Sequence, residues 1–405
     1  MSAPDEAWLT GHRRSLLDVA TASRHPAGGF GWLDRSRRLV VDHPVPLWIT
    51  CRMTYVFALA ALHEGADTAD LVGHGLDALD GPLHDDVHGG WFAAIGTDGP
   101  VDDSKRAYDH AFVVLAASAA LAAGHERART LLAEALGVLE RRFLDEATGL
   151  YADVFDRAFV SREPYLGANA NMHLVEALLA AADATATTWP VERALQLAER
   201  IVHRIAPGLG HRLPEHLDES GRPVLDYHRD EPAHPFRPYG VTVGHQLEWS
   251  RLLVQLSRGL GPAAPAWLLD DARGLFDRAV ADGWSVDGAE GFVYTVDFDG
   301  EPVVHERMHW VVAEAISAAR VLDATFPGEG YGDRETEWWV HARRYFVDPA
   351  GAWHHELDRT LRPAHSVWDG KPDVYHAYQA ALLPRTGVAT SFVSRPRDRA
   401  TGPTG

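Results

Sequence analysis

The chain has 405 residues, and its 57 Asp and Glu residues outnumber its 38 Lys and Arg residues, which gives a formal net charge of −19 with histidine neutral. An acidic excess of this size is repelled by the phosphates of nucleic acids, so we expect no nucleic-acid partner. Apolar residues make up 46% of the chain and charged residues 23%, which excludes a disordered chain and predicts a large packed core.

The cellular setting follows from the cysteine content and from the apolar segments. Cys51 is the only cysteine, so an intramolecular disulfide is excluded, and the N-terminal segment lacks the basic and apolar regions of a secretory signal. The longest uncharged apolar stretch, residues 111–124, is shorter than the roughly 20 residues of a membrane-spanning helix. We therefore expect a cytoplasmic protein that has no membrane partner.

Short glycine-aromatic segments recur along the chain at residues 29–32, 90–92, 149–151, 291–294 and 351–354. They lie about 60 residues apart, and the one longer gap holds two units if a further segment lies near residues 210–213. Such a regular spacing is the sequence signature of a repeat architecture.

The segments between these points show helical periodicity of two kinds. Residues 127–143 have one apolar face and predict an outer helix, whereas residues 111–123 are apolar nearly all round, which is typical of a helix buried on every side. Six units with one inner and one outer helix each predict an all-α (α/α)6 barrel with short β-hairpin loops at one mouth. An open solenoid is the alternative, but its repeats are usually shorter, roughly 34 to 47 residues.

The composition also predicts the structure of two segments outside the repeats. Residues 215–239 are rich in Pro, His, Asp and Arg and predict an ordered loop over one mouth of the barrel. We expect one catalytic domain over residues 1–385 and a mobile C-terminal tail over residues 386–405, because the tail contains few apolar residues.

Each predicted inner helix begins with one basic or imidazole side chain, namely Arg52, His110, His173, His245, His309 and His376. These residues occupy nearly equivalent places in the repeat, and equivalent places of a closed ring converge on its axis. Burying six such polar groups together is costly for stability, so their convergence indicates a functional pocket.

The residue types suit proton transfer on carbon. Histidine can take up and release a proton near neutral pH, while Arg52 stays charged and can stabilise negative charge that develops on a substrate oxygen. Asn169 lies four residues before His173, on the same face of a helix that includes both, and could bind a sugar hydroxyl.

A metal site is the competing use of clustered histidines. His245 and Glu248 have the i, i+3 spacing of a possible ligand pair, but the His-Glu-x-x-His motif of zinc proteases is missing from the sequence. We expect no metal and no other cofactor.

Four segments resemble one known family. They are residues 52–57 (RMTYVF), 168–173 (ANANMH), 238–249 (PYGVTVGHQLEW) and 370–376 (GKPDVYH). In this order and at these spacings, over about 330 residues, the sequence resembles the N-acylglucosamine 2-epimerase superfamily, and within it the mannose and sulfoquinovose isomerase branch.

The resemblance implies a metal-independent (α/α)6 barrel that acts on free monosaccharides through a cis-enediolate. It implies that His245 and His376 form the general acid/base pair, that Arg52 polarises the substrate oxygens, and that His173 and Asn169 help to hold them. Further candidates for the pocket wall are Tyr108, His110, Arg237, Glu248 and Trp310.

The resemblance also suggests a substrate. Tyr55 stands where cellobiose 2-epimerases have a Trp, which favours a monosaccharide, and we identified no additional cationic site for a sulfonated sugar. The expected reaction interconverts D-mannose and D-fructose, with D-lyxose and D-xylulose as a side reaction, in a monomer or homodimer.

Three other functions stay open at this point. A sugar 2-epimerase shares the first half of the reaction, and the residue types do not separate it from an isomerase. A glycoside hydrolase would need two inward carboxylates, for which Asp109, Glu248 and Glu314 are the candidates. A non-catalytic sugar-binding scaffold would tolerate the substitution His376→Ala.

Overall fold

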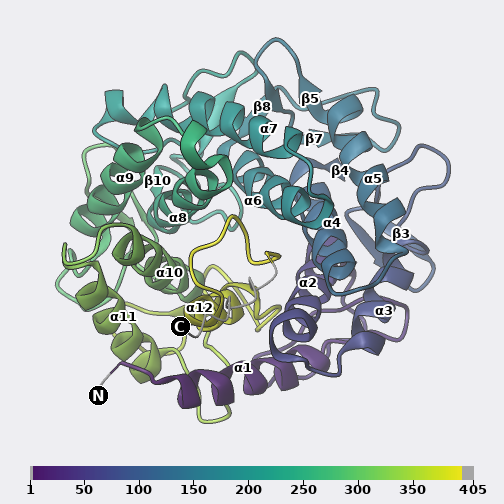
Figure 1. Cartoon of the computed structure of the whole chain (residues 1–405), viewed down its shortest axis with the longest axis horizontal. Coiled ribbons are helices and arrows are strands. Elements are labelled where there is room, and N and C mark those ends of the chain that lie inside the picture. Colours follow the sequence, from purple (N-terminus) through teal and green to yellow (C-terminus); the bar gives the residue numbers. More distant parts are fainter. Residues whose placement is uncertain (1–2, 395–405) are drawn as a thin grey trace, which may run out of the picture.

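The helices form two concentric rings around a common axis in the computed structural model, which describes residues 3–394 (Figure 1). The inner ring consists of α2 (Leu47–Glu64), α4 (Ala107–Ala122), α6 (Ala168–Thr185), α8 (Val243–Leu260), α10 (His309–Thr325) and α12 (Tyr375–Thr386). The outer ring consists of α1 (Glu6–Thr21), α3 (Ala69–Leu79), α5 (Ala128–Val138), α7 (Trp189–Ala198), α9 (Trp267–Gly283) and α11 (Tyr331–Tyr345). Short helical turns are η1 (Leu139–Phe143), η2 (Glu199–His203), η3 (Ala206–Leu209) and η4 (Gly261–Ala263).

The distribution of apolar residues explains the two rings. Helix α2 is buried without interruption from Leu47 to Ala60, so it has no polar face to turn toward solvent. Helix α9 instead buries one stripe that includes Leu268, Ala272 and Leu275. Neighbouring inner helices pack against each other, and α12 packs against α2, which closes the ring. The predicted (α/α)6 barrel is confirmed, and the open solenoid is excluded.

Short antiparallel strands gather at one mouth of the barrel. They are β1 (Val45–Pro46), β2 (Ala94–Gly96), β3 (Gly99–Asp102), β4 (Lys105–Arg106), β5 (Leu144–Asp145), β6 (Leu150–Tyr151), β7 (Val154–Phe155), β8 (Tyr165–Gly167), β9 (His216–Asp218), β10 (Val241–Thr242), β11 (Thr295–Val296), β12 (Pro302–Val304), β13 (Arg307–Met308) and β14 (Glu356–Leu357). They pair in the orders β1-β2-β3, β10-β11-β12, β4-β7, β5-β6, β8-β9 and β13-β14.

The strands fix where the inner helices begin. Strands β1, β4, β8, β10 and β13 each run directly into an inner helix, and each pairs with a strand from further along the chain. Val45 of β1, for example, lies opposite Ile95 of β2. The first turns of the inner helices are therefore held at the hairpin mouth, which is where the sequence concentrates its basic and imidazole residues. Within residues 3–394, none of the helices is long and apolar enough to cross a membrane.

The chain after α12 crosses the opposite mouth of the barrel. Phe392 and Val393 are each only 2% exposed, and the Phe392 ring lies 5.8 Å from the guanidinium of Arg251 on α8. The His63 ring donates to the Phe392 carbonyl (2.7 Å), and the Ser391 hydroxyl donates to Asp183 (2.6 Å). In Figure 1 this yellow segment crosses the centre of the ring.

This arrangement differs from the expected mobile tail over residues 386–405. Residues 387–394 pack against the barrel because the apolar side chains of Phe392 and Val393 are buried there. The mostly polar composition of residues 386–405 gave no indication of this packing. Residues 395–405 lie outside the described part of the chain.

Replacing Phe392 by Ala should lower the free energy of unfolding by about 3 kcal/mol, because it leaves a cavity beside a buried guanidinium. Phe392→Leu keeps most of the side-chain volume and should cost about 1 kcal/mol. Urea unfolding followed by circular dichroism measures both values, and equal values for the two variants would contradict the described packing.

Candidate functional site

A cavity opens at the hairpin mouth and holds about 650 Å³ of space, part of it open to solvent. All six inner helices contribute to its wall, together with residues from the loops at the mouth. It is lined by Trp48, Arg52, Tyr108, Asn169, His173, Pro235, Phe236, His245, Glu248, Tyr294, His309, Trp310, His355, Trp368, Pro372, Asp373 and His376.

Two histidines in the first turns of α8 and α12 are each paired with a carboxylate. Nδ1 of His245 lies 2.9 Å from Glu215 Oε2, and Nδ1 of His376 lies 2.8 Å from Glu314 Oε1. A carboxylate accepts a hydrogen bond, so each Nδ1 carries the proton and each Nε2 is left as the basic nitrogen. The Trp310 ring contacts both imidazoles, with centroid separations of 5.0 Å to His245 and 5.7 Å to His376.

His376 is neutral at physiological pH. Burial lowers its pKa well below the ordinary value, and the nearby charge of Arg52 lowers it further. A neutral imidazole that offers Nε2 can take a proton from a substrate carbon, so this side chain has the state that a general base requires.

Arg52 is held in a fixed orientation on α2. Its Nη1 donates to Asp373 Oδ2 (3.0 Å) and its Nη2 donates to the Tyr108 hydroxyl (2.9 Å), while its Nε is buried without a partner among the described residues. The rings of Trp48 and Phe112 lie 4.9 and 4.5 Å from the guanidinium carbon. Burial opposes ionisation of Asp373, but Arg52 and then His376 hold its pKa below the usual value.

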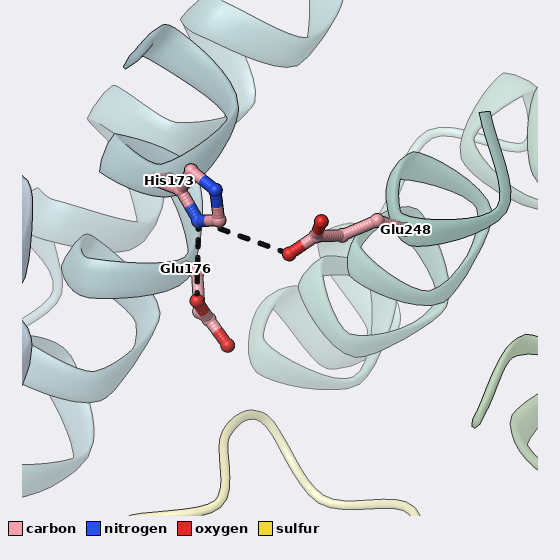
Figure 2. Close-up of side chains that lie close together, drawn as sticks. All are labelled: His173, Glu176 and Glu248. Carbon is pink, nitrogen blue, oxygen red and sulfur yellow. Dashed lines mark ion pairs between the residues drawn. The ribbon is translucent and has the colours of Figure 1, made fainter. Parts of the chain in front are cut away.

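Helix α6 carries the two remaining polar residues expected in the site. It begins at Ala168 and therefore includes Asn169, whose Oδ1 is buried without a hydrogen-bond partner in the described structure. Burial lowers the pKa of His173 to about 4, so this ring is neutral. Its Nδ1 lies 3.6 Å from Glu176 Oε2 and 3.8 Å from Glu248 Oε1. Figure 2 shows the ring of His173 between these two carboxylates.

The residues with metal-ligand spacing lie partly in the cavity wall, where His173, Glu248 and His376 are found, and partly behind it. Within residues 3–394, the sets His173, Glu176, Glu248 and Glu248, Glu314, His376 each bring their ligand atoms within 4.8 Å of one another. Their three carboxylates surround the guanidinium of Arg251, which is a cation already, so the place fits a divalent metal poorly. His245 belongs to neither set, because it faces Glu215.

Two candidate residues from the sequence lie outside the cavity wall. Both ring nitrogens of His110 are used in packing, since Nδ1 donates to the Arg106 carbonyl (2.8 Å) and Nε2 accepts from the Trp91 amide (3.2 Å). Of the six residues expected to converge on one pocket, five line the cavity. On α4, Tyr108 lies in the cavity wall instead of His110. Arg237 lines a neighbouring cavity, where its Nη2 pairs with Asp153 and Glu163, each at 2.8 Å.

The remaining candidates line the cavity, along with residues that sequence reasoning missed. Tyr108, Glu248 and Trp310 are in its wall. The sequence did not point to Glu215 and Asp373. Glu215 accepts a hydrogen bond from His245, and Asp373 accepts one from Arg52. Asp373 lies inside one of the quoted segments and only three residues before His376, which is a signal that could have identified it. Glu215 lies in a loop, where no periodicity marks it.

Comparisons with known proteins place the chain in a family. Residues 28–380 match the family model described as N-acylglucosamine 2-epimerase (GlcNAc 2-epimerase). The chain is 54% identical to a D-mannose isomerase of Thermobifida fusca, over 96% of both chains, and 43% identical to a D-mannose isomerase of Pseudomonas cannabina pv. alisalensis, over 96% of this chain and 94% of the relative.

The structure is similar to a crystal structure of a D-mannose isomerase, with a TM-score of 0.87 and 28% identity over 93% of this chain and 97% of that one. A family model that spans most of the barrel and relatives of this identity establish the membership. The chain belongs to the N-acylglucosamine 2-epimerase family of sugar isomerases and epimerases.

Proposed function

We propose that the enzyme is an aldose-ketose isomerase that interconverts D-mannose and D-fructose, with D-lyxose and D-xylulose as a second pair. The observation that carries this proposal is the pair His245 and His376, each with Nδ1 on a carboxylate and each lining the same cavity as Arg52. The high identity to proteins named D-mannose isomerase supports the choice of sugar.

The chemistry follows from these groups. After the sugar ring opens, one imidazole Nε2 takes the C2 proton, and the electron pair of the C–H bond forms the C1=C2 bond of a cis-enediolate. The negative charge develops on the C1 oxygen, where Arg52 can stabilise it. Transfer of the O2 proton to O1 and return of a proton to C1 then give the ketose, with C2 as the carbonyl carbon and a hydroxyl on C1.

The wall of the cavity favours a single neutral sugar ring. Trp48, Phe236 and Trp368 form an aromatic rim, with ring centroids 5.1 to 6.4 Å apart, that suits the apolar face of a sugar. Among the described residues that line the cavity, Arg52 is the only arginine or lysine, and it is already paired with Asp373. This supports a neutral hexose over a sulfonated one.

The hydrolase alternative has little support in the cavity. Asp109 does not line it, and Glu314 is bound by Arg251 and His376. Glu248 and Asp373 are the acidic residues of the wall, and Asp373 is held by Arg52. A pair of free carboxylates across the substrate, which hydrolysis requires, is thus missing from the described residues.

The setting of the enzyme is part of the proposal. We propose a cytoplasmic monomer or homodimer that acts on a free monosaccharide, without nucleic-acid or membrane partner. The single cysteine supports a reducing compartment, and the acidic composition supports the lack of a nucleic-acid partner. The guanidinium among the buried carboxylates supports catalysis without a metal or other cofactor.

Chelator-treated enzyme should convert D-mannose into D-fructose in D2O with no metal added, because protein side chains supply both the proton transfers and the positive charge. A proton NMR time course measures the products. Glucose appearing before fructose would make the enzyme a 2-epimerase, and activity that returned only with metal would contradict the metal-free reaction.

His245→Ala and His376→Ala should each lower kcat by at least about a hundredfold with the fold retained, which is the usual contribution of a general acid or base. His110→Asn is the matched control, since His110 begins the equivalent helix but lies outside the cavity. It should lower the melting temperature and leave kcat within about threefold of the parent. Near-normal kcat in both alanine variants would refute the assignment.

The activity should fall at acid pH with a midpoint below 6.5, because burial lowers the pKa of His376 from its ordinary value of 6.5 and the neutral form is the reactive one. A pH profile of kcat/KM, which reports the free enzyme, measures this midpoint. An acid limb centred at or above 6.5 would contradict the role of a buried neutral base.

A further inference from the structure

Three glutamates from three inner helices meet a single arginine beneath the cavity. Arg251 of α8 places Nε 2.8 Å from Glu314 Oε2 on α10, and Nη2 lies 3.3 Å from Glu248 Oε1 on α8 and 3.7 Å from Glu176 Oε1 on α6. All four side chains are at least nine-tenths buried. The Phe392 ring covers the guanidinium from the mouth of the barrel opposite the cavity.

The charges in this region do not balance. Arg52, whose charge also acts on Glu248, is paired with a fourth carboxylate, Asp373. Two buried arginines therefore face four carboxylates, and an uncompensated buried anion is strongly unfavourable. A buried carboxylate in excess normally binds a proton, which removes its charge.

The hydrogen bonds identify the carboxylate that binds the proton. Glu176 accepts from the Tyr375 hydroxyl and from Gln379 Nε2 (2.9 Å), and Glu314 accepts from Arg251 Nε and from His376 Nδ1 (2.8 Å). Glu248 has one long contact to Arg251, and its Oε2 is buried with no partner among the described residues. Glu248 is therefore the carboxylate that is least stabilised as an anion.

The electrostatic environment also indicates that Glu248 is the carboxylate least stabilised as an anion. Burial raises the pKa of Glu248 well above its usual value, and the charge of Glu314 raises it further. Burial also raises the pKa of Glu314, whereas His173 and Arg251 hold the pKa of Glu176 below its usual value despite burial. The titratable and charged groups that face Glu248 are Arg52 on α2, Tyr108 on α4, His173 and Glu176 on α6, Arg251 on α8, Glu314 on α10, and Tyr375 and His376 on α12.

We propose that Glu248 is a neutral carboxylic acid in the folded enzyme and donates an O–H hydrogen bond to a substrate oxygen in the cavity. Arg251 is the positioning residue, because its guanidinium pairs with Glu314 and lies near Glu176, which favours the ionised forms of these two and leaves the proton to Glu248. The donation to substrate rests on the proposed isomerase function, whereas the neutral state does not. A neutral acid at this position stabilises an oxygen that becomes negative in the enediolate, since it offers a donor without adding a charge.

Infrared spectroscopy tests the neutral state directly. The carbonyl stretching band of a protonated carboxylic acid should be present in the parent enzyme at neutral pH and lose intensity in Glu248→Gln. Glu176→Gln is the matched control and should leave this band unchanged. A spectrum in which Glu248→Gln removes no protonated carboxyl band would overturn the proposal.

Thermal unfolding gives a second, independent test. A proton that Glu248 holds when folded and loses when unfolded makes the parent less stable as pH rises, so the melting temperature of Glu248→Gln should increase relative to the parent between about pH 5 and pH 8. Glu176→Gln and Glu314→Gln each remove an anion paired with Arg251 and should lower the melting temperature by several degrees at neutral pH. A difference between Glu248→Gln and the parent that stayed constant with pH would overturn the neutral state.

The role toward substrate is tested by kinetics. Gln keeps an N–H donor at position 248 and Met does not, so kcat/KM of Glu248→Gln should exceed that of Glu248→Met by at least about tenfold. Equal losses would overturn the donor role. Failure of the isomerase assignment itself would be recognised separately, because the infrared and thermal results do not depend on turnover.

Discussion

The burial of the six inner helices is the constraint on which the rest of the structure depends. A helix such as α2 can bury its apolar surface only when other helices surround it. The inner six helices therefore pack into a closed ring, and the outer six cover them. Any polar side chain on an inner helix is then committed to the interior, where it needs a partner. The networks around Arg52 and Arg251 are the result, and the same side chains form the wall and floor of the cavity.

Several residues of the cavity wall hold a buried polar atom that has no hydrogen-bond partner in the described structure. Buried atoms without a partner in the described structure include Arg52 Nε, Asn169 Oδ1, His173 Nδ1 and Glu248 Oε2, and all four residues line the cavity. Native proteins rarely leave buried polar atoms unpaired, and such atoms mark functional places when they occur together. A polyhydroxylated ligand offers both donors and acceptors, so it complements this mixed set better than an apolar ligand would.

Much of the fold and part of the site could be predicted from the sequence. The repeat of about 60 residues and the all-round apolar helices were sufficient for the barrel, and the basic or imidazole residue of each inner helix located the cavity. His110 shows the limit, because spacing in the sequence does not fix the face of a helix, and Tyr108, two residues earlier, points to the cavity instead. Glu215 and Phe392 lie in irregular segments, where tertiary contacts alone give them their places.

The ring is closed by the two ends of the chain. Helix α1 packs against α12, and residues 387–394 cross the mouth opposite the cavity, where Phe392 and Val393 are buried. During synthesis, the apolar inner helices therefore emerge from the ribosome long before the segments that complete the ring and cover its interior. Since exposed apolar surface promotes aggregation, the nascent barrel is most vulnerable while it lacks its last unit, and its cellular yield depends on how that open intermediate is protected.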